Sequence, residues 1–350
     1  MNLDDLTALR RIDRSGTLSV MERTPERLAP PADAAKTCGK RLNRPLNVVF
    51  GGVGGSGIVG EILTDFSRDV VDVPVSVCRS LQVPCFVGKG TLFIAISYSG
   101  ETQETLTLLD QAKRKGAGVV TVGSGGRLLA QSRQQGIPYL KVPEGMLPRV
   151  ALPELLAAAI FVMESAALLK DSEKILGKAA GLLRTQIKSI SQTAPLQRNK
   201  AKQMAQALVD RLPLLIGNEE NGSVLRRFKN ELNENSKMPA FYYTLPEGYH
   251  DDVEGLKTLN QLSRTQPILL RSHEGLEGQR RTREKLYALL AELGFPPVLE
   301  FEGIGEDGLG QLLTAVTFGD YVSVYLAALR GLDPSELELI PKFREAMRGA

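Results

Sequence analysis

Short apolar, β-branched segments alternate with amphipathic helical segments along most of this 350-residue chain. In the first half the apolar segments lie at residues 46–50, 73–78, 92–96, 118–122 and 138–142. Helical patterns separate them, notably at residues 56–66 and 101–115. Buried strands that alternate with helices form βαβ units, whose parallel sheet is covered on both faces. This half of the chain therefore predicts a complete, doubly wound α/β domain.

The second half repeats the alternation after a long helical stretch, in which we expect a break near Gly177. Strands are expected at residues 213–217, 240–244, 267–271 and 297–301, and helices at 223–236, 252–264, 275–293 and 306–329. Such a pattern is typical of a second α/β domain. The expected divisions are an N-terminal helical arm (1–40), a first α/β domain (41–152), a helical connection (153–207) and a second α/β domain (208–350).

Charge and hydropathy exclude several classes of partner. Lys and Arg number 43 against 40 Asp and Glu, so the near-balanced chain is not expected to bind nucleic acid or an anionic membrane surface. The basic run at residues 280–285 lies on a predicted helix with Glu277 and Glu284 and is interpreted as a solvated helix face. Residues 1–14 do not resemble a secretory signal, and the most apolar run, residues 155–169, contains Glu164. We therefore expect a cytoplasmic protein with no membrane partner.

Cysteine and histidine usage argues against disulfides and metal sites. Cys38, Cys78 and Cys85 are odd in number and form no Cys-x-x-Cys pair, which disfavours a disulfide framework and a cysteine zinc site. The histidines are only two, His250 and His273. A multi-histidine metal site is therefore not expected.

A glycine-rich turn follows the first predicted strand, at residues 50–57. Gly52, Gly54 and Gly57 match the Gly-x-Gly-x-x-Gly dinucleotide fingerprint. That fingerprint also needs a carboxylate at the end of the second strand, where Arg79 stands instead. A nucleotide-dependent oxidoreductase is therefore disfavoured, and a purely structural turn remains an alternative.

Hydroxyl side chains cluster after the third predicted strand. Ser97, Ser99 and Thr102 lie within six residues, where a strand ends and a helix begins. Hydroxyls beside free N–H groups at a helix N-terminus form a phosphate cradle, and the helix dipole favours the anion. The alternative is an ordinary helix cap, with Ser99 capping and Gly100 easing the turn. Capping explains one serine but not all three hydroxyls.

These segments together resemble a known family. Gly-Gly-Ser-Gly after the first strand and Ser-Tyr-Ser-Gly-x-Thr after the third look like the sugar isomerase (SIS) domain, which binds phosphosugars. Residues 147–153 are similar to the Pro-Arg-x-Ala-Leu motif of the bifunctional phosphoglucose/phosphomannose isomerases, as are residues 228–237 and 245–250. Residues 1–5 also resemble that family's start. The match runs in order over nearly the whole chain.

The resemblance implies a fold and a reaction. The fold is two tandem SIS-type, three-layer αβα domains with mainly parallel sheets. The reaction is the interconversion of glucose 6-phosphate, fructose 6-phosphate and mannose 6-phosphate through a cis-enediol, without metal or cofactor, in cytoplasmic carbohydrate metabolism. The residues matched to phosphate binding are Gly54, Gly55, Ser56, Ser97, Ser99 and Thr102.

Three further residues take chemical roles by the same resemblance. Glu234 matches the base that moves the proton between C1 and C2, although most helix glutamates are simply solvated. His250 matches the ring-opening histidine, which reaches the site from the neighbouring subunit and so implies a homodimer; otherwise it is a loop histidine. Arg149 matches the group that stabilises the enediolate, the alternative being a surface ion pair.

The chain departs from the pattern in two places. Tyr325 stands where some relatives have a lysine, and Asp251 and Asp252 follow His250. The rival functions are a non-catalytic phosphosugar sensor and an isomerase of another phosphosugar. A sensor needs no proton shuttle, so the presence of both Glu234 and His250 favours an enzyme.

Overall fold

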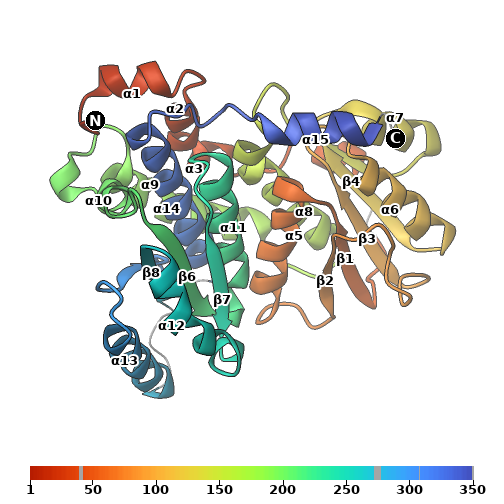
Figure 1. The fold of residues 1–350 in the computed structure, drawn as a ribbon. Coiled ribbons are helices and arrows are strands. Elements are labelled where there is room, and N and C mark those ends of the chain that lie inside the picture. Colours follow the sequence, from red (N-terminus) through yellow and green to blue (C-terminus); the bar gives the residue numbers. More distant parts are fainter. Residues whose placement is uncertain (39–41, 272–276, 307, 349–350) are drawn as a thin grey trace. The chain divides into compact units, whose positions relative to one another are not determined.

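The computed structural model describes residues 1–38, 42–271, 277–306 and 308–348. His273 and the start of the helix expected at 275–293 lie outside these residues. The chain divides into two compact units (Figure 1). Unit 1 comprises Met1–Glu22, Leu183–Glu306 and Gln311–Ala350, and unit 2 comprises Arg23–Leu182 and Asp307–Gly310. Each unit is described by itself.

Unit 2 contains a parallel sheet with the strand order β2-β1-β3-β4-β5. Its strands are β1 (Asn47–Gly51), β2 (Val75–Cys78), β3 (Thr91–Ile96), β4 (Gly118–Gly123) and β5 (Tyr139–Lys141). All four pairings are parallel, and every residue of β3 is buried. The predicted doubly wound α/β architecture is confirmed.

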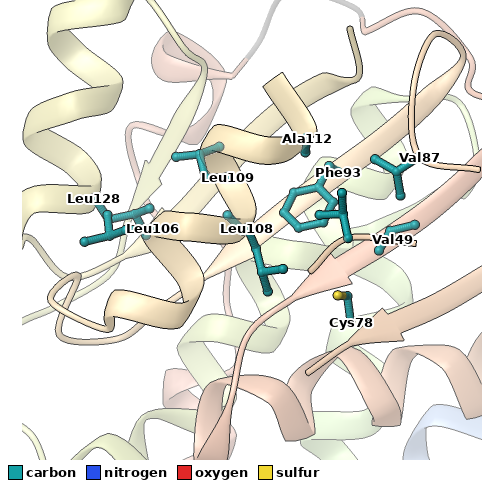
Figure 2. Packing of buried hydrophobic residues seen from close by; sticks show 11 residues of the cluster. Val49, Cys78, Val87, Phe93, Leu106, Leu108, Leu109, Ala112 and Leu128 are labelled. Carbon is teal, nitrogen blue, oxygen red and sulfur yellow. The ribbon is translucent and has the colours of Figure 1, made fainter. Parts of the chain in front are cut away.

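Helices cover both faces of this sheet, with α5 (Gly54–Ser67) and α6 (Gln103–Arg114) on opposite faces. The other helices of the unit are α3 (Thr24–Arg27), α4 (Ala34–Thr37), α7 (Gly126–Gln135), the short 3₁₀ helix η1 (Pro148–Ala151) and α8 (Leu152–Ser165). Figure 2 shows Leu108 and Leu109 of α6 packed near Val49 and Phe93 of the sheet. Burial of this apolar helix face holds α6 on the sheet.

Unit 1 contains a second parallel sheet, with the order β7-β6-β8-β9. Its strands are β6 (Leu212–Asn218), β7 (Phe241–Leu245), β8 (Thr265–Arg271) and β9 (Leu299–Glu302). Its helices are α1 (Leu6–Ile12), α2 (Thr17–Glu22), α10 (Lys200–Ala207), α11 (Gly222–Glu234), α12 (Asp252–Leu262), α13 (Glu277–Glu292) and α15 (Leu339–Arg348), with the 3₁₀ turns η2 (Leu196–Arg198), η3 (Glu219–Asn221) and η4 (Glu247–Tyr249). Helices α9 (Ser172–Ile190) and α14 (Gly308–Leu329) each contribute residues to both units.

The break expected near Gly177 was wrong. Gly177 lies inside α9, which runs without interruption, and the break falls earlier, between Ser165 and Ser172. The Glu164 carboxylate fixes the new helix start, because it accepts hydrogen bonds from the backbone N–H (3.0 Å) and the hydroxyl (2.5 Å) of Ser172. A glycine is tolerated within a long helix when tertiary packing stabilises the remainder.

Among the described residues, one helix is long and apolar enough to cross a membrane by length and composition. This helix is α14, with 22 residues and a mean hydropathy of 1.5 in its most apolar window. Within that window 89% of the residues are buried inside the protein, as in the core helix of a soluble fold. It was not the run that the sequence singled out, residues 155–169, which forms most of α8.

A buried lysine holds the N-terminal segment in unit 1. The Lys202 side chain is fully buried, and its ammonium donates to Asp4 and to the carbonyl oxygens of Gln192 and Ala194, each at 2.9 Å. The Tyr325 ring lies 5.7 Å from the same ammonium, and its hydroxyl donates to the Ile190 carbonyl at 2.7 Å. Tyr325, the departure from the family pattern, is therefore a core residue that packs against Lys202.

Replacement of Asp4 by Asn is expected to lower the free energy of unfolding by about 2 kcal/mol, because it leaves a buried ammonium without its counter-charge. The hydrogen bond from Lys202 holds the pKa of Asp4 below its ordinary 3.8. Since the folded-state pKa is lowered, this stabilisation is present above pH 3.8 and is lost as the pH falls through the folded-state value. Urea unfolding of both proteins between pH 3 and 7 measures it. Asp33→Asn, which removes an exposed carboxylate, is the control, and an equal effect of both changes would contradict the prediction.

Candidate active site

The predicted phosphate residues gather where the strand order of unit 2 reverses. Phe50 and Val49 are neighbours in β1 and point to opposite faces of the sheet. Gly60 of α5 packs on Phe50, whereas α6 packs on the face that carries Val49. The helices that follow β1 and β3 therefore leave the sheet in opposite directions. In open α/β sheets, ligands bind in the crevice outside the carboxyl ends of two such strands.

Close backbone contacts explain the glycines of the first turn. A Cβ on Gly52 would lie 2.8 Å from the Ile96 carbonyl oxygen, and one on Gly57 would lie 2.6 Å from that of Gly52. Gly54 begins α5 with a φ of +58°. The N-cap residue, Val53, makes no side-chain cap hydrogen bond. The first N–H groups of α5 are thus suited to an anion at the helix N-terminus.

The turn that carries Ser97, Ser99 and Thr102 after β3, here called the hydroxyl turn, is held by hydrogen bonds within itself. A further hydrogen bond joins it to the glycine turn at residues 50–57. The hydroxyls of Ser97 and Thr102 lie 2.9 Å apart, and the backbone N–H of Gly100 donates to Ser97 Oγ at 3.1 Å. The backbone N–H of Tyr98 donates to Ser56 Oγ at 3.1 Å, which joins the two turns. Ser97 is buried and acts as a brace for the turn, whereas Ser99 is exposed. Thr102, not Ser99, is the N-cap residue of α6.

A third loop, after β4, supports the cradle and was missed in the sequence. Gly100 has a φ of +68°, and a Cβ there would lie 1.9 Å from the carbonyl oxygen of Gly125. Glu101 accepts from the side chain of Arg127 at 2.8 Å and from its backbone N–H at 2.9 Å. The available signal was the glycine pair, Gly125 and Gly126, directly after a buried strand.

Gly100→Ala should therefore destabilise the protein by about 3 kcal/mol or more, since a left-handed backbone cost of about 1–2 kcal/mol adds to a backbone clash. Gly136→Ala is the matched control. Gly136 has a φ of +65°, but a Cβ there meets nothing within 4 Å, so only the backbone cost applies. The melting temperatures of the two variants measure the difference, and Gly100→Ala should melt at the lower temperature. Equal melting temperatures would show that the contact with Gly125 is unimportant.

Arg149 lies beside the glycine turn. It is in η1, is 5% exposed, and its Cα would lie 3.6 Å from a Cβ built on Gly55. The structure thus brings Arg149 together with Gly54, Gly55 and Ser56 in unit 2. A buried arginine beside a helix N-terminus concentrates positive charge where an anionic substrate is expected.

Glu234 and His250 belong to unit 1. Glu234 is the last residue of α11 and is half-buried. Buried Arg227 lies about two helical turns before it and bonds to Glu231 and Asp320, each at 2.9 Å. Burial alone would lower the pKa of Arg227, but the carboxylates of Asp320 and Glu231 raise it, so the guanidinium stays charged. This network, which the sequence did not reveal, anchors the end of α11 to α14.

Asn235 extends the same network. Its side-chain amide donates to Glu231 and to the Ser323 hydroxyl, both at 2.9 Å. Burial of Asn235 is nearly complete, at 2% exposed. These two bonds tie Asn235, the residue after Glu234, to α11 and to α14.

His250 lies at the edge formed by the carboxyl ends of the strands, whereas Glu234 lies at the edge formed by their amino ends. His250 follows β7 and η4, is exposed, and its backbone N–H donates to the Glu247 carbonyl at 2.8 Å. Helix α11 returns to the edge where β7 begins, as Figure 1 shows, so the 13 residues of α11 separate the two edges by about 20 Å. Unit 1 therefore does not bring Glu234 and His250 of one chain together.

The carboxyl edge of the second sheet is unlike the cradle. Glu219 and Glu220 follow β6, at the position that the glycine turn occupies after β1, and Glu247 follows β7. Carboxylates there repel a phosphate. Within the described residues, no group of three or more His, Cys, Asp or Glu side chains is arranged to hold a metal ion.

Comparison with known proteins agrees with this geometry. Residues 197–347 match the family described as the bacterial phospho-glucose isomerase C-terminal SIS domain. A bifunctional phosphoglucose/phosphomannose isomerase from Thermoplasma acidophilum is 30% identical over 85% of this chain and 89% of its own length. A D-glucosamine-6-phosphate 4-epimerase from Sulfolobus acidocaldarius is 29% identical over 85% of this chain and 88% of its own.

A solved structure extends the likeness to the fold. A glucose-6-phosphate isomerase like protein from Thermus thermophilus superimposes with a TM-score of 0.64 over 99% of both chains, at 16% identity. At this identity the superposition shows a shared architecture and no more. Together with the sequence match across most of the chain, it confirms the SIS-type fold. The chain belongs to the bifunctional phosphoglucose/phosphomannose isomerase family.

Proposed function

We propose that this protein is an aldose–ketose isomerase that interconverts glucose 6-phosphate and fructose 6-phosphate and also accepts mannose 6-phosphate. The observation that carries the proposal is the meeting of the glycine turn and the hydroxyl turn at the switch point of the first sheet. Backbone N–H groups of α5, with the hydroxyls of Ser99 and Thr102, would hold the sugar phosphate. The site is one for a small, phosphorylated, hydroxyl-rich ligand in cytoplasmic carbohydrate metabolism.

The protein's own side chains suffice for the proton transfers. His250 protonates the ring oxygen and accepts the proton of the anomeric hydroxyl, which opens the sugar. Glu234 removes the proton from C2 of the aldose and returns it to C1, while the hydroxyl proton moves from O2 to O1. Arg149 stabilises the negative charge of the enediolate between these steps. Glucose and mannose phosphates differ only at C2, so both give the same enediol.

The positions of the two proton-transfer residues support a site built from two chains. Glu234 and His250 lie at opposite edges of the same sheet, and the length of α11, about 20 Å, separates these edges. General acid–base groups must come within hydrogen-bond reach of one substrate. We therefore propose a homodimer in which His250 of each chain serves the site that contains Glu234 of the other.

A second candidate is an isomerase or epimerase of an amino sugar phosphate. The relative from Sulfolobus acidocaldarius favours it, because its name assigns 4-epimerisation of glucosamine 6-phosphate to a protein about as similar to this chain as the bifunctional isomerases are. The two candidates share the phosphate anchor and differ in the carbon that reacts. A non-catalytic sensor would share the anchor alone.

Replacement of Glu234 by Gln should reduce kcat by about 1,000-fold with little change in KM, because it removes the base and leaves the phosphate anchor. A coupled assay would test fructose 6-phosphate, glucose 6-phosphate, mannose 6-phosphate and glucosamine 6-phosphate, each with and without a metal chelator. Glu292→Gln, an exposed glutamate of α13, is the control. Phosphosugar binding without turnover of any hexose phosphate would refute the isomerase and leave the sensor.

The shared site predicts complementation between two inactive variants. When Glu234→Gln and His250→Asn proteins are unfolded together and refolded, half of the random dimers are mixed, and each mixed dimer holds one intact site. Activity should return to about a quarter of that of the wild type. Refolding of each variant alone is the control. Absence of recovery, with mixed dimers demonstrated by differential tagging, would mean that both residues serve one chain.

A further inference from the structure

The loop that carries Arg149 is held in place by Arg27, a largely buried arginine of α3. Its guanidinium donates two hydrogen bonds to the Glu154 carboxylate, from Nε to Oε1 at 2.6 Å and from Nη2 to Oε2 at 2.8 Å. Both side chains are nearly buried, at 12% and 7% exposed. A bidentate arginine–carboxylate pair out of water is strong and fixes the orientation of both partners.

Arg27 also bonds to the loop itself. Its Nη2 donates to the carbonyl oxygen of Val150 at 2.5 Å and lies 3.0 Å from the sulfur of Met146. Val150 is the residue after Arg149, so the peptide that follows Arg149 is tied to a group on α3. A pair that served only to hold α3 on α8 would not need this third bond.

Tyr98 anchors the other end of the same loop. Its hydroxyl accepts from the backbone N–H of Met146 at 2.9 Å and donates to the Pro143 carbonyl at 3.1 Å. Tyr98 is 5% exposed, and burial raises the pKa of its phenol, so the hydroxyl keeps the proton that it donates. The backbone N–H of Tyr98 donates to Ser56 of the glycine turn, so Tyr98 holds the loop in a fixed position relative to that turn.

We propose that Arg27 is a positioning residue, which sets the place of Arg149 relative to the phosphate cradle through Val150 and Glu154. The inference rests on the proposed function, in which Arg149 stabilises the enediolate. Arg27 does not touch the substrate. A displacement of about 1 Å in a group that acts on the transition state costs on the order of 100-fold in rate. The phosphate contacts belong to other loops and should be unaffected.

The kinetic test uses Arg27→Gln and the conservative Arg27→Lys. Both should lower kcat by about 10- to 100-fold while KM stays within about threefold, because the loss falls on the transition state and not on phosphate binding. Lysine should not rescue, since it cannot make the bidentate pair and the bond to Val150 together. Affinity for a sugar-phosphate hydroxamate, which mimics the enediolate, should fall in parallel with kcat.

The control is Arg44→Gln. Arg44 also lies in unit 2 and also pairs with a carboxylate, that of Asp72, and with a carbonyl oxygen, that of Ala167 at 2.8 Å. Within the described part of the chain, no hydrogen bond or ion pair of Arg44 reaches the loop at residues 143–150. Its replacement should leave kcat and hydroxamate affinity unchanged. An equal loss in both variants would mean that Arg27 acts only through general stability.

A double-mutant cycle with Arg149→Ala separates positioning from stability. If Arg27 acts through Arg149, Arg27→Gln should reduce kcat little further once Arg149 is gone, whereas independent effects would multiply. Multiplication of the two losses would overturn the proposal while leaving the isomerase reaction intact. Loss of activity in Arg149→Ala but not in Arg27→Gln would do the same.

Hydrogen exchange tests the positioning without reference to activity. The backbone N–H of Met146 should exchange faster in Arg27→Gln than in Arg44→Gln or the wild type, since the loop loses one of its two anchors. Unchanged exchange would overturn the proposal even in a protein with normal turnover. Failure of the proposed function is distinct, because the wild type itself would then lack isomerase activity.

Discussion

The candidate site depends on how closely three backbone segments approach one another at the carboxyl edge of the first sheet. The hydroxyl turn touches the loop after β4 at Gly100 and Gly125, and the glycine turn touches the end of β3 at Gly52 and Ile96. At these distances a Cβ atom has no room. This packing places the N-terminus of α5 beside the hydroxyl turn at the carboxyl ends of β1 and β3, where open α/β sheets bind their ligands.

In each unit, a buried or largely buried ion pair holds a segment that bears a proposed site residue. Arg27 and Arg227 each hold a buried carboxylate partner and a segment that bears a proposed site residue. Removal of such a charge from water is costly unless each hydrogen-bonding group is satisfied, so these pairs tolerate one geometry only. The rigidity that the proposed site requires would thus come from ion pairs formed within the protein.

Much of the fold could be predicted from the chain. The strands of both sheets agree with the apolar runs to within about two residues at each end, because a buried parallel strand must be continuously apolar. The helix break was misplaced, because Gly177 is a weak local signal and the true break is set by the Glu164 carboxylate bonding to Ser172. The loop after β4 was overlooked, since its role appears only where Gly125 meets Gly100. Domain boundaries and the roles of Glu234, His250 and Arg149 stay predictions.

The sequence by itself determined the parallel α/β architecture, the glycine and hydroxyl turns and the family, because these follow from local periodicity and from motifs a few residues long. Only the tertiary structure decided which serine is a brace and which is exposed, which arginine supports Arg149, and that Glu234 and His250 stand at opposite edges of one sheet. Each of these depends on contacts between segments far apart in the chain, which no local pattern encodes.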